Sequence, residues 1–266
     1  MTIDTGHAPV SRAWLTGGIG GTVVAILVGT AAVWHWAVSP APQSQAQAQT
    51  YQHQVARVEL DLAAGTIALA AGPDAVVQVH RVVHWSVSRP VVREVWSGNT
   101  LRVTAQCPRE HSACAVDYTL QVPANTVVQA RTGAGDLAIR DLTDEVRLDT
   151  GAGRTRVDDV RGDLWIHSGE GDITATGLRS RQLQLDTGSG RVDLRYAVSP
   201  ATVRVTAGDG DISVTVPPVA GGTDAGYRVT ARTEDGEQRV GVREDSSSPR
   251  TITADTGSGN VTVGYA

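Results

Sequence analysis

Three copies of an Asp-Thr-Gly tripeptide followed by a small residue are the first feature of this sequence that could do chemistry. They begin at Asp149, Asp186 and Asp255, and Ala or Ser follows each one. This is the signature of aspartic proteases, in which two aspartates share one proton. The aspartate position is not kept, however, because sister copies of the surrounding repeat carry Arg131 or His167 there. We therefore interpret the tripeptide as a structural corner and not as a protease site.

His167 falls between Asp149 and Asp186 in the aligned repeats, with Trp165 on the same face two residues earlier. An imidazole flanked by carboxylates could bind a metal ion or act in acid–base chemistry. The same carboxylates favour the imidazolium form, which is a poor metal ligand. We therefore expect an exposed ladder of ion pairs, without metal or catalysis. Trp165, His167, Asp149 and Asp186 remain candidates for binding, with Trp165 as a sugar contact.

Cys107 and Cys114 lie seven residues apart, between two strand patterns. Outside a cell, such a pair most often forms a disulfide, which is our prediction here. His111 between them allows a Cys/His metal site as the alternative, but only three ligands are in view. Two cysteines in 266 residues exclude both a disulfide-framework miniprotein and a multi-cysteine cluster. The sequence predicts no cofactor and no metal.

The elements that position these residues recur along the chain. After residue 55 the sequence alternates apolar and polar residues with period two and is rich in Val and Thr, which indicates strands. A Gly-x-Gly tripeptide recurs in steps of 18, 18, 19, 20 and finally 49 residues. Its copies start at Gly133, Gly151, Gly169, Gly188, Gly208 and Gly257.

Each copy has two apolar positions in the strand before the glycines and mostly two in the strand after them. A third apolar position follows in the turn, at Leu142, Val160, Leu178 and Val198. Such a unit cannot bury its apolar face alone and must stack on its neighbours. We therefore predict an all-β parallel β-helix, or solenoid, with rungs of 18–20 residues; a β-sandwich is the alternative fold.

The predicted solenoid domain spans residues 55–266. Its first rung is incomplete at 55–72, residues 73–125 resemble antiparallel hairpins at one end, and 217–250 reads as an insertion. The residue after each Gly-x-Gly would point outward and stack on its counterpart about 4.8 Å away. That column alternates in charge, which predicts a salt ladder that fixes the register. It contains Asp136, Arg154, Asp172, Arg191, Asp211 and Asn260.

A membrane segment is expected near the N-terminus. The 25 residues 14–38 contain no Asp, Glu, Lys or Arg, and Trp14 and Trp36 stand near its two ends like interfacial anchors. With Arg12 before it, we predict a cytoplasmic stub (1–12), a transmembrane helix (13–38) and a disordered linker (39–54). A cleaved signal peptide is the alternative, because residues 46–48 resemble an Ala-x-Ala cleavage site.

Small residues form a stripe in this predicted helix. Gly17, Gly21, Ala25 and Gly29 recur every fourth residue, a pattern that lets two helices approach closely and predicts a homo-oligomer. The formal net charge of the chain is −5, with 23 basic residues against 28 acidic ones. Such a balance lacks the basic excess that nucleic-acid binding requires, so we expect no nucleic acid as a partner.

The repeat resembles a bacterial family of unknown function labelled putative adhesin. The likeness covers residues 55–266. It rests on the opening stretch at 58–69, on the Thr-Gly-Ser-Gly and Thr-Gly-Ala-Gly corners, and on the closing stretch at 256–263. The resemblance implies an extracytoplasmic β-solenoid, often behind one membrane helix, and it brings no catalytic residues.

These features predict a membrane-anchored binding or scaffold protein of the bacterial envelope. It would be a single-pass protein with its N-terminus in the cytoplasm and its C-terminal domain outside. Its partner would be an envelope polymer or a membrane protein. One alternative is a carbohydrate-active β-helix enzyme. Such an enzyme would need clustered carboxylates, whereas the predicted outward columns alternate in the sign of their charge. Another is an accessory sensor in envelope-stress signalling, which would need a membrane partner because residues 1–12 are a short output segment.

Overall fold

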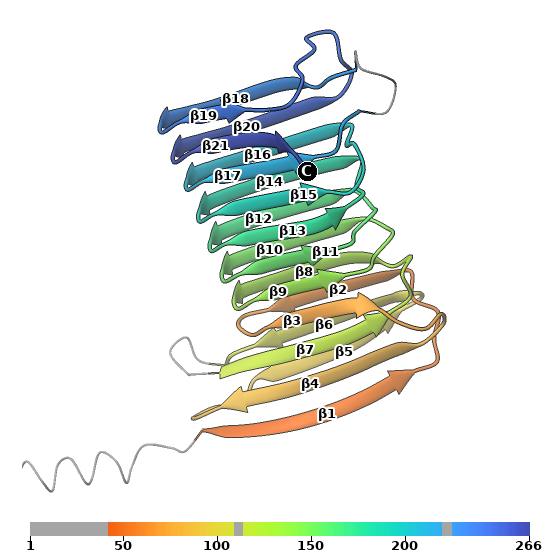
Figure 1. Ribbon diagram of the computed structural model, residues 1–266. Coiled ribbons are helices and arrows are strands. Elements are labelled where there is room, and N and C mark those ends of the chain that lie inside the picture. Colours follow the sequence, from red (N-terminus) through yellow and green to blue (C-terminus); the bar gives the residue numbers. More distant parts are fainter. Residues whose placement is uncertain (1–41, 109–113, 220–224) are drawn as a thin grey trace, which may run out of the picture. The chain divides into compact units, whose positions relative to one another are not determined.

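The computed structural model describes residues 42–108, 114–219 and 225–266, which form two long β-sheets (Figure 1). In spatial order, sheet A contains β1 (Gln43–Tyr51), β4 (Val77–Trp85), β7 (Cys114–Val122), β3 (Ile67–Ala71), β9 (Leu137–Arg140), β11 (Thr155–Asp158), β13 (Ile173–Leu178), β15 (Val192–Tyr196), β17 (Ile212–Val216), β21 (Val261–Tyr265) and β19 (Gln238–Val240). Sheet B contains β18 (Arg228–Asp235), β20 (Thr251–Ser258), β16 (Thr202–Asp209), β14 (Gln182–Ser189), β12 (Leu164–Glu170), β10 (Val146–Ala152), β8 (Val127–Ala134), β2 (Arg57–Leu62), β6 (Thr100–Gln106) and β5 (Val91–Ser97).

Each rung contributes one strand to each sheet, and equivalent strands of successive rungs pair in parallel. In sheet B, β8, β10, β12 and β14 are neighbours, and their partners β9, β11, β13 and β15 are neighbours in sheet A. The pairing joins equivalent positions of the repeat: Leu148 lies opposite both Ala130 and Ile166. The predicted solenoid is therefore confirmed, and the sandwich alternative is wrong.

At both ends of the solenoid the rungs are stacked out of chain order. The rung β6/β7 pairs in parallel with β2 and β3, and lies on the opposite side of them from β8/β9. The rung β18/β19 likewise lies outside β20/β21, although it comes first in the chain. The prediction of an insertion at 217–250 is thus corrected, because that stretch supplies the terminal rung. Of the hairpins expected within 73–125, β5/β6 is one, whereas β6 and β7 together form a further rung.

The disordered linker expected at 39–54 is also corrected, for residues 43–51, which form β1. All nine residues of β1 pair antiparallel with β4 and extend sheet A by one strand. The segment shows no apolar alternation because most of its side chains are exposed, and its backbone pairing with β4 holds it in place. Two side chains add contacts: Gln47 accepts a hydrogen bond from Arg81, and the rings of Tyr51 and Trp96 are 5.4 Å apart.

The core lies between the two sheets and is built from the inward positions of the repeat. The predicted third apolar position is fully buried at Leu142, Val160 and Leu178. Val198 breaks the pattern, because it is 40% exposed, and Tyr196 lies opposite Leu178 instead. The pairing of β13 with β15 shifts in register between Ala175 and Leu178. Tyr196 therefore takes the buried position that the repeat predicts for Val198.

The paired glycines are required by how closely the corners stack. Gly171 has φ +130°, and a Cβ placed on it would lie 2.0 Å from the carbonyl oxygen of Gly153 in the rung before. Gly169, the first glycine of the same corner, would bring a Cβ to 2.4 Å from the carbonyl oxygen of Gly151. No side chain fits at either distance, and φ +130° favours glycine in addition. The corners therefore restrict both positions to glycine.

A buried polar cluster lies where β1, β4, β5 and β7 meet. The Glu94 side chain is only 10% exposed; it forms an ion pair with Arg81 at 2.6 Å and accepts a hydrogen bond from the Tyr118 hydroxyl at 2.9 Å. The Tyr51 hydroxyl donates to the other carboxylate oxygen at 3.0 Å. Burial raises the pKa of Tyr118, which keeps its phenol a neutral donor. Because Glu94 comes from sheet B and its three partners from sheet A, the cluster ties the two sheets together at this end.

Several expectations lie outside the described residues. These are the cytoplasmic stub, the transmembrane helix at 13–38, the small-residue stripe within it, and His111. Within the residues that the structure describes, no helix is long and apolar enough to span a membrane.

The close stacking of the corners makes a prediction about stability. Gly171→Ala should lower the free energy of unfolding by about 2–4 kcal/mol, because the new methyl group forces the corners apart and alanine is strained at this φ. Gly264→Ala in β21 is the matched control, since nothing lies within 4 Å of a Cβ there. Chemical denaturation of the two variants measures the difference. Equal stability of both variants would show that the corner contacts do not constrain the stack.

Candidate binding surface

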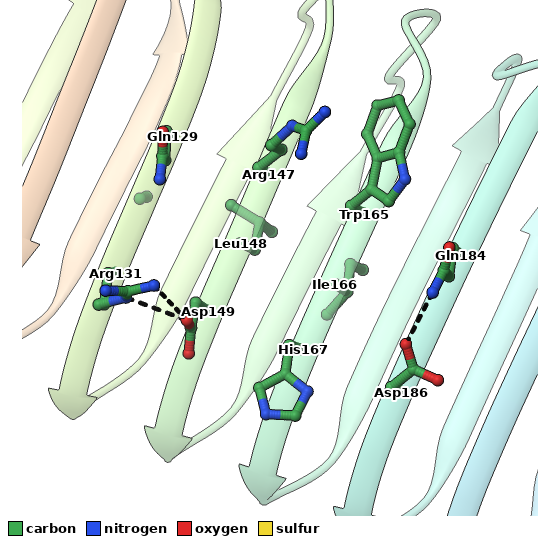
Figure 2. A pocket seen from close by; sticks show the side chains of 11 residues that line it. Gln129, Arg131, Arg147, Leu148, Asp149, Trp165, Ile166, His167, Gln184 and Asp186 are labelled. Carbon is green, nitrogen blue, oxygen red and sulfur yellow. Dashed lines mark hydrogen bonds and ion pairs between the residues drawn. The ribbon is translucent and has the colours of Figure 1, made fainter.

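Two rows of outward side chains cross sheet B at right angles to its strands. Because strand residues alternate between faces, every second residue of a strand points away from the core, and two of these positions on each strand form the rows. The register places them in line, so that the first row is Gln129, Arg147, Trp165 and Gln184. The second row, two residues further along each strand, is Arg131, Asp149, His167 and Asp186. Figure 2 shows these two rows.

The structure brings the four predicted binding residues together. Trp165, His167, Asp149 and Asp186 all line one open depression of about 280 Å³ between the two rows. Its floor is formed by Ala130, Leu148 and Ile166, whose side chains belong to the core. The depression spans β8, β10, β12 and β14, so its shape depends on the parallel register of four successive rungs.

Several of the lining side chains are held in place by neighbours. Arg131 and Asp149 form an ion pair at 2.9 Å, and Gln184 donates a hydrogen bond to Asp186 at 3.1 Å. Arg147 lies with its guanidinium carbon 4.5 Å from the centre of the Trp165 ring, a cation–π contact. Arg147 also pairs with Glu145 at 2.5 Å, outside the rows. These contacts fix the side chains that line the depression before any ligand arrives.

His167 has a different environment. It is exposed, and it makes no hydrogen bond or ion pair with any residue that the structure describes. Asp149 and Asp186 lie opposite it on the two neighbouring strands, as the alignment of the repeats predicts. Within the described ranges, no group of three His, Cys, Asp or Glu residues is placed to hold a metal ion. The ring nitrogens of His167 are therefore available for a ligand on the surface.

The Asp-Thr-Gly corners cannot form a protease dyad in this arrangement. Asp149 and Asp186 are two rungs apart, with His167 between them. Two rungs correspond to about 9.6 Å between backbones at the usual strand spacing. Carboxyl groups that share a proton must be in hydrogen-bond contact, which this spacing does not provide for side chains standing side by side.

The alternating column after the glycines differs from the expected salt ladder. Its first pair is an ion pair, Arg154 to Asp136, at 3.2 Å. The contact that recurs is instead a hydrogen bond, in which the side-chain oxygen of an Asp or Asn accepts from a backbone N–H of the next rung. It is found from Asp117 to Thr66 (2.8 Å), Asp136 to Arg154 (2.9 Å), Asp172 to Arg191 (3.0 Å), Asp211 to Asn260 (2.8 Å) and Asn260 to Glu237 (3.0 Å). The column therefore satisfies backbone donors at the corners, with Asp or Asn as the acceptor.

Cys107 and Cys114 are joined by a disulfide, with their Cα atoms 6.0 Å apart. The bridge connects the end of β6 in sheet B to the start of β7 in sheet A. At this position the central rungs turn on a Gly-x-Gly corner, whereas here residues 107–113 separate the two strands in the sequence. The disulfide thus closes a rung that has no glycine between its two strands.

These features define a two-sheet β-solenoid with one open, polar, pre-ordered face. The chain belongs to the Toastrack DUF4097 family, whose model matches residues 55–266. This family membership agrees with the resemblance seen in the sequence, and no curated protein matches the chain.

Solved structures resemble this chain at low sequence identity, and the first of those below shows the fold. A putative adhesin from Bacteroides fragilis is 13% identical, with a TM-score of 0.50 over 84% of this chain and 97% of that chain. A putative cell adhesion protein from Clostridium sporogenes is 10% identical, with a TM-score of 0.40 over 85% and 100% of the two chains. A putative lipid binding protein from Parabacteroides distasonis is 12% identical, with a TM-score of 0.47 over 84% and 96%.

The corner column makes a second prediction. Asp172→Arg should lower the free energy of unfolding by about 1–2 kcal/mol, because the Arg191 N–H loses its acceptor and the new cation stands between two arginines. Asp172→Asn should stay within about 0.5 kcal/mol of wild type, since an amide oxygen can also accept, as that of Asn260 does from Glu237. Chemical denaturation at low and high salt measures both variants. Equal losses in the two variants would mean that charge and not hydrogen bonding governs the column.

Proposed function

We propose that this protein is a non-catalytic, adhesin-like binding protein of the bacterial cell envelope. Residues 13–38 would hold it in the membrane with the N-terminus in the cytoplasm, and the solenoid would lie outside. The observation that carries the proposal is the open depression lined by Trp165, His167, Asp149 and Asp186. Its side chains are held by hydrogen bonds and ion pairs on a stiff two-sheet scaffold, which suits recognition without rearrangement.

The shape of the face favours binding over catalysis. A hydrolase that acts on sugars places two carboxyl groups on either side of the bond that it cleaves. Asp149 and Asp186 instead stand in one row on the same wall of a shallow depression, and each contacts a neighbouring side chain. The Bacteroides fragilis structure of this fold bears the name putative adhesin, which agrees with a binding role.

The strand β1 favours an uncleaved anchor. A cut after Ala48 would remove residues 43–48, which pair with β4. The mature chain would then lose most of β1, including Gln47, which contacts Arg81. The pairing of β1 with β4 from Gln43 onward therefore favours a chain that is not cleaved and stays continuous with residues 13–38.

The proposed topology predicts the outcome of limited proteolysis on intact protoplasts. Protease added outside protoplasts should digest the chain on the C-terminal side of residue 38, while a tag at the N-terminus stays protected until the membrane is broken. Western blots against tags at the two ends measure this. A soluble form that begins near Gln49, or digestion of the N-terminal tag in intact protoplasts, would rule out the proposed anchor and its orientation.

The proposed binding role predicts capture without turnover. The full chain in detergent micelles should co-sediment with insoluble envelope polysaccharide and release no soluble sugar. Trp165→Ala should reduce the captured fraction several-fold, whereas Thr174→Ala on the outer face of sheet A is the matched control and should leave it unchanged. Release of reducing ends that Asp149→Asn or Asp186→Asn abolishes would instead identify an enzyme.

A further inference from the structure

The depression described above does not end at β8. A second depression of about 320 Å³ lies across β6, β2 and β8, and both are lined by Gln129 and Arg131. The register continues the first row through Glu59 and Arg102, and the second row through Asp61 and Thr104. The two depressions are therefore one axial trough, a name used here for the channel between the two rows from β6 to β14.

The trough runs along the solenoid axis and crosses six strands. Five strand spacings at about 4.8 Å give it a length of about 24 Å. Its floor is the backbone of inward-pointing residues such as Leu60, Leu148 and Ile166, and its walls are the two rows of polar side chains. A channel of this shape suits an extended polymer that lies across the strands, because a compact ligand would fill only part of it.

The charges along the trough nearly cancel. Three arginines face four carboxylates, so that the formal charge is 3 − 4 = −1 with His167 neutral. All three arginines are already paired: Arg102 with Glu59 at 2.6 Å, Arg131 with Asp149 at 2.9 Å, and Arg147 with Glu145, outside the rows, at 2.5 Å. The charged residues are Arg102, Arg131, Arg147, Glu59, Asp61, Asp149 and Asp186. A polyanion would find no net positive charge to attract it, so the trough suits a neutral ligand.

The spacing of the hydrogen-bonding groups narrows the class of polymer. Donors and acceptors recur once per rung, at about 4.8 Å, which is comparable to the length of one pyranose residue in an extended glycan. An extended polypeptide advances about 3.3–3.4 Å per residue and would fall out of step with the rungs. Carboxylate, guanidinium and amide groups are suited to sugar hydroxyls, and Trp165 adds aromatic surface.

We propose that the axial trough binds a neutral, extended polysaccharide, with one sugar residue per rung. This inference rests on the proposed binding function and specifies its ligand. It predicts that Gln129 and His167 contact the glycan. Gln129 lies where the two depressions join, and the ring nitrogens of His167 face no protein partner among the described residues.

The test uses neutral oligosaccharides of increasing length. Chito-oligosaccharides and cello-oligosaccharides of two to six residues are titrated into the full chain in detergent micelles, with binding followed by calorimetry. At least one series should bind, with an affinity that rises steadily from the dimer to the hexamer, since the trough crosses six rungs. Gln129→Ala and His167→Ala should each weaken binding of the hexamer about three- to tenfold, the equivalent of one hydrogen bond. Arg156→Ala in β11, on the outer face of sheet A, is the control and should bind like wild type.

Three outcomes would overturn the inference. One is failure of both oligosaccharide series to bind while insoluble envelope polymer still co-sediments with the chain; the proposed function then stands and the trough is not its site. A second is hexamer binding that neither Gln129→Ala nor His167→Ala weakens. The third is tighter binding of a polyanion such as polygalacturonate, or of an extended polar peptide, than of either neutral hexamer.

Discussion

The stack depends on how closely the backbone corners approach one another. A Cβ on Gly153 would lie 2.2 Å from the carbonyl oxygen of Gly135, and one on Gly171 would lie 2.0 Å from that of Gly153. Because these contacts join backbone to backbone, each rung with this corner must turn at the same height and in the same register as the last. That common register aligns the outward side chains into rows and places Asx acceptors beside the N–H groups of the next corner. The binding surface is thus a consequence of the corners.

A stack of parallel strands ends in two open edges, and each end of this protein is finished differently. At the first end, β4 and β1 extend sheet A, β5 extends sheet B, and Glu94 joins the two sheets through Arg81 and Tyr118. Antiparallel strands there interrupt the parallel stacking pattern. At the other end the out-of-order rung β18/β19 covers β20/β21. Such terminal elements are needed because a repeat array cannot leave its last apolar layer in water.

The proposed function follows from the regularity of the middle rungs. Equal spacing along the axis places two outward side chains of each rung in line about every 4.8 Å, a property that a globular fold seldom offers over such a length. A ligand that is itself a repeating chain can use that regularity, while a small molecule would use only one rung. Ion pairs such as Arg131–Asp149 cost little to keep at an exposed site and hold the walls of the trough in place.

The sequence by itself determined the rungs from β8 to β17, their glycine corners, and the outward rows that hold Trp165 and His167. These follow from short-range rules, since period-two alternation and Gly-x-Gly mark each rung locally. Only the tertiary structure decided that β6/β7 and β18/β19 lie outside the rungs that neighbour them in the chain, that β1 is a strand, and that Glu94 meets Arg81. The reason is that parallel strands pair through their backbones, so an open edge accepts any strand of suitable length, and no side-chain pattern records which one. Tyr196 replaces Val198 in the core for a related reason, because a shift of register in one rung is invisible in its composition.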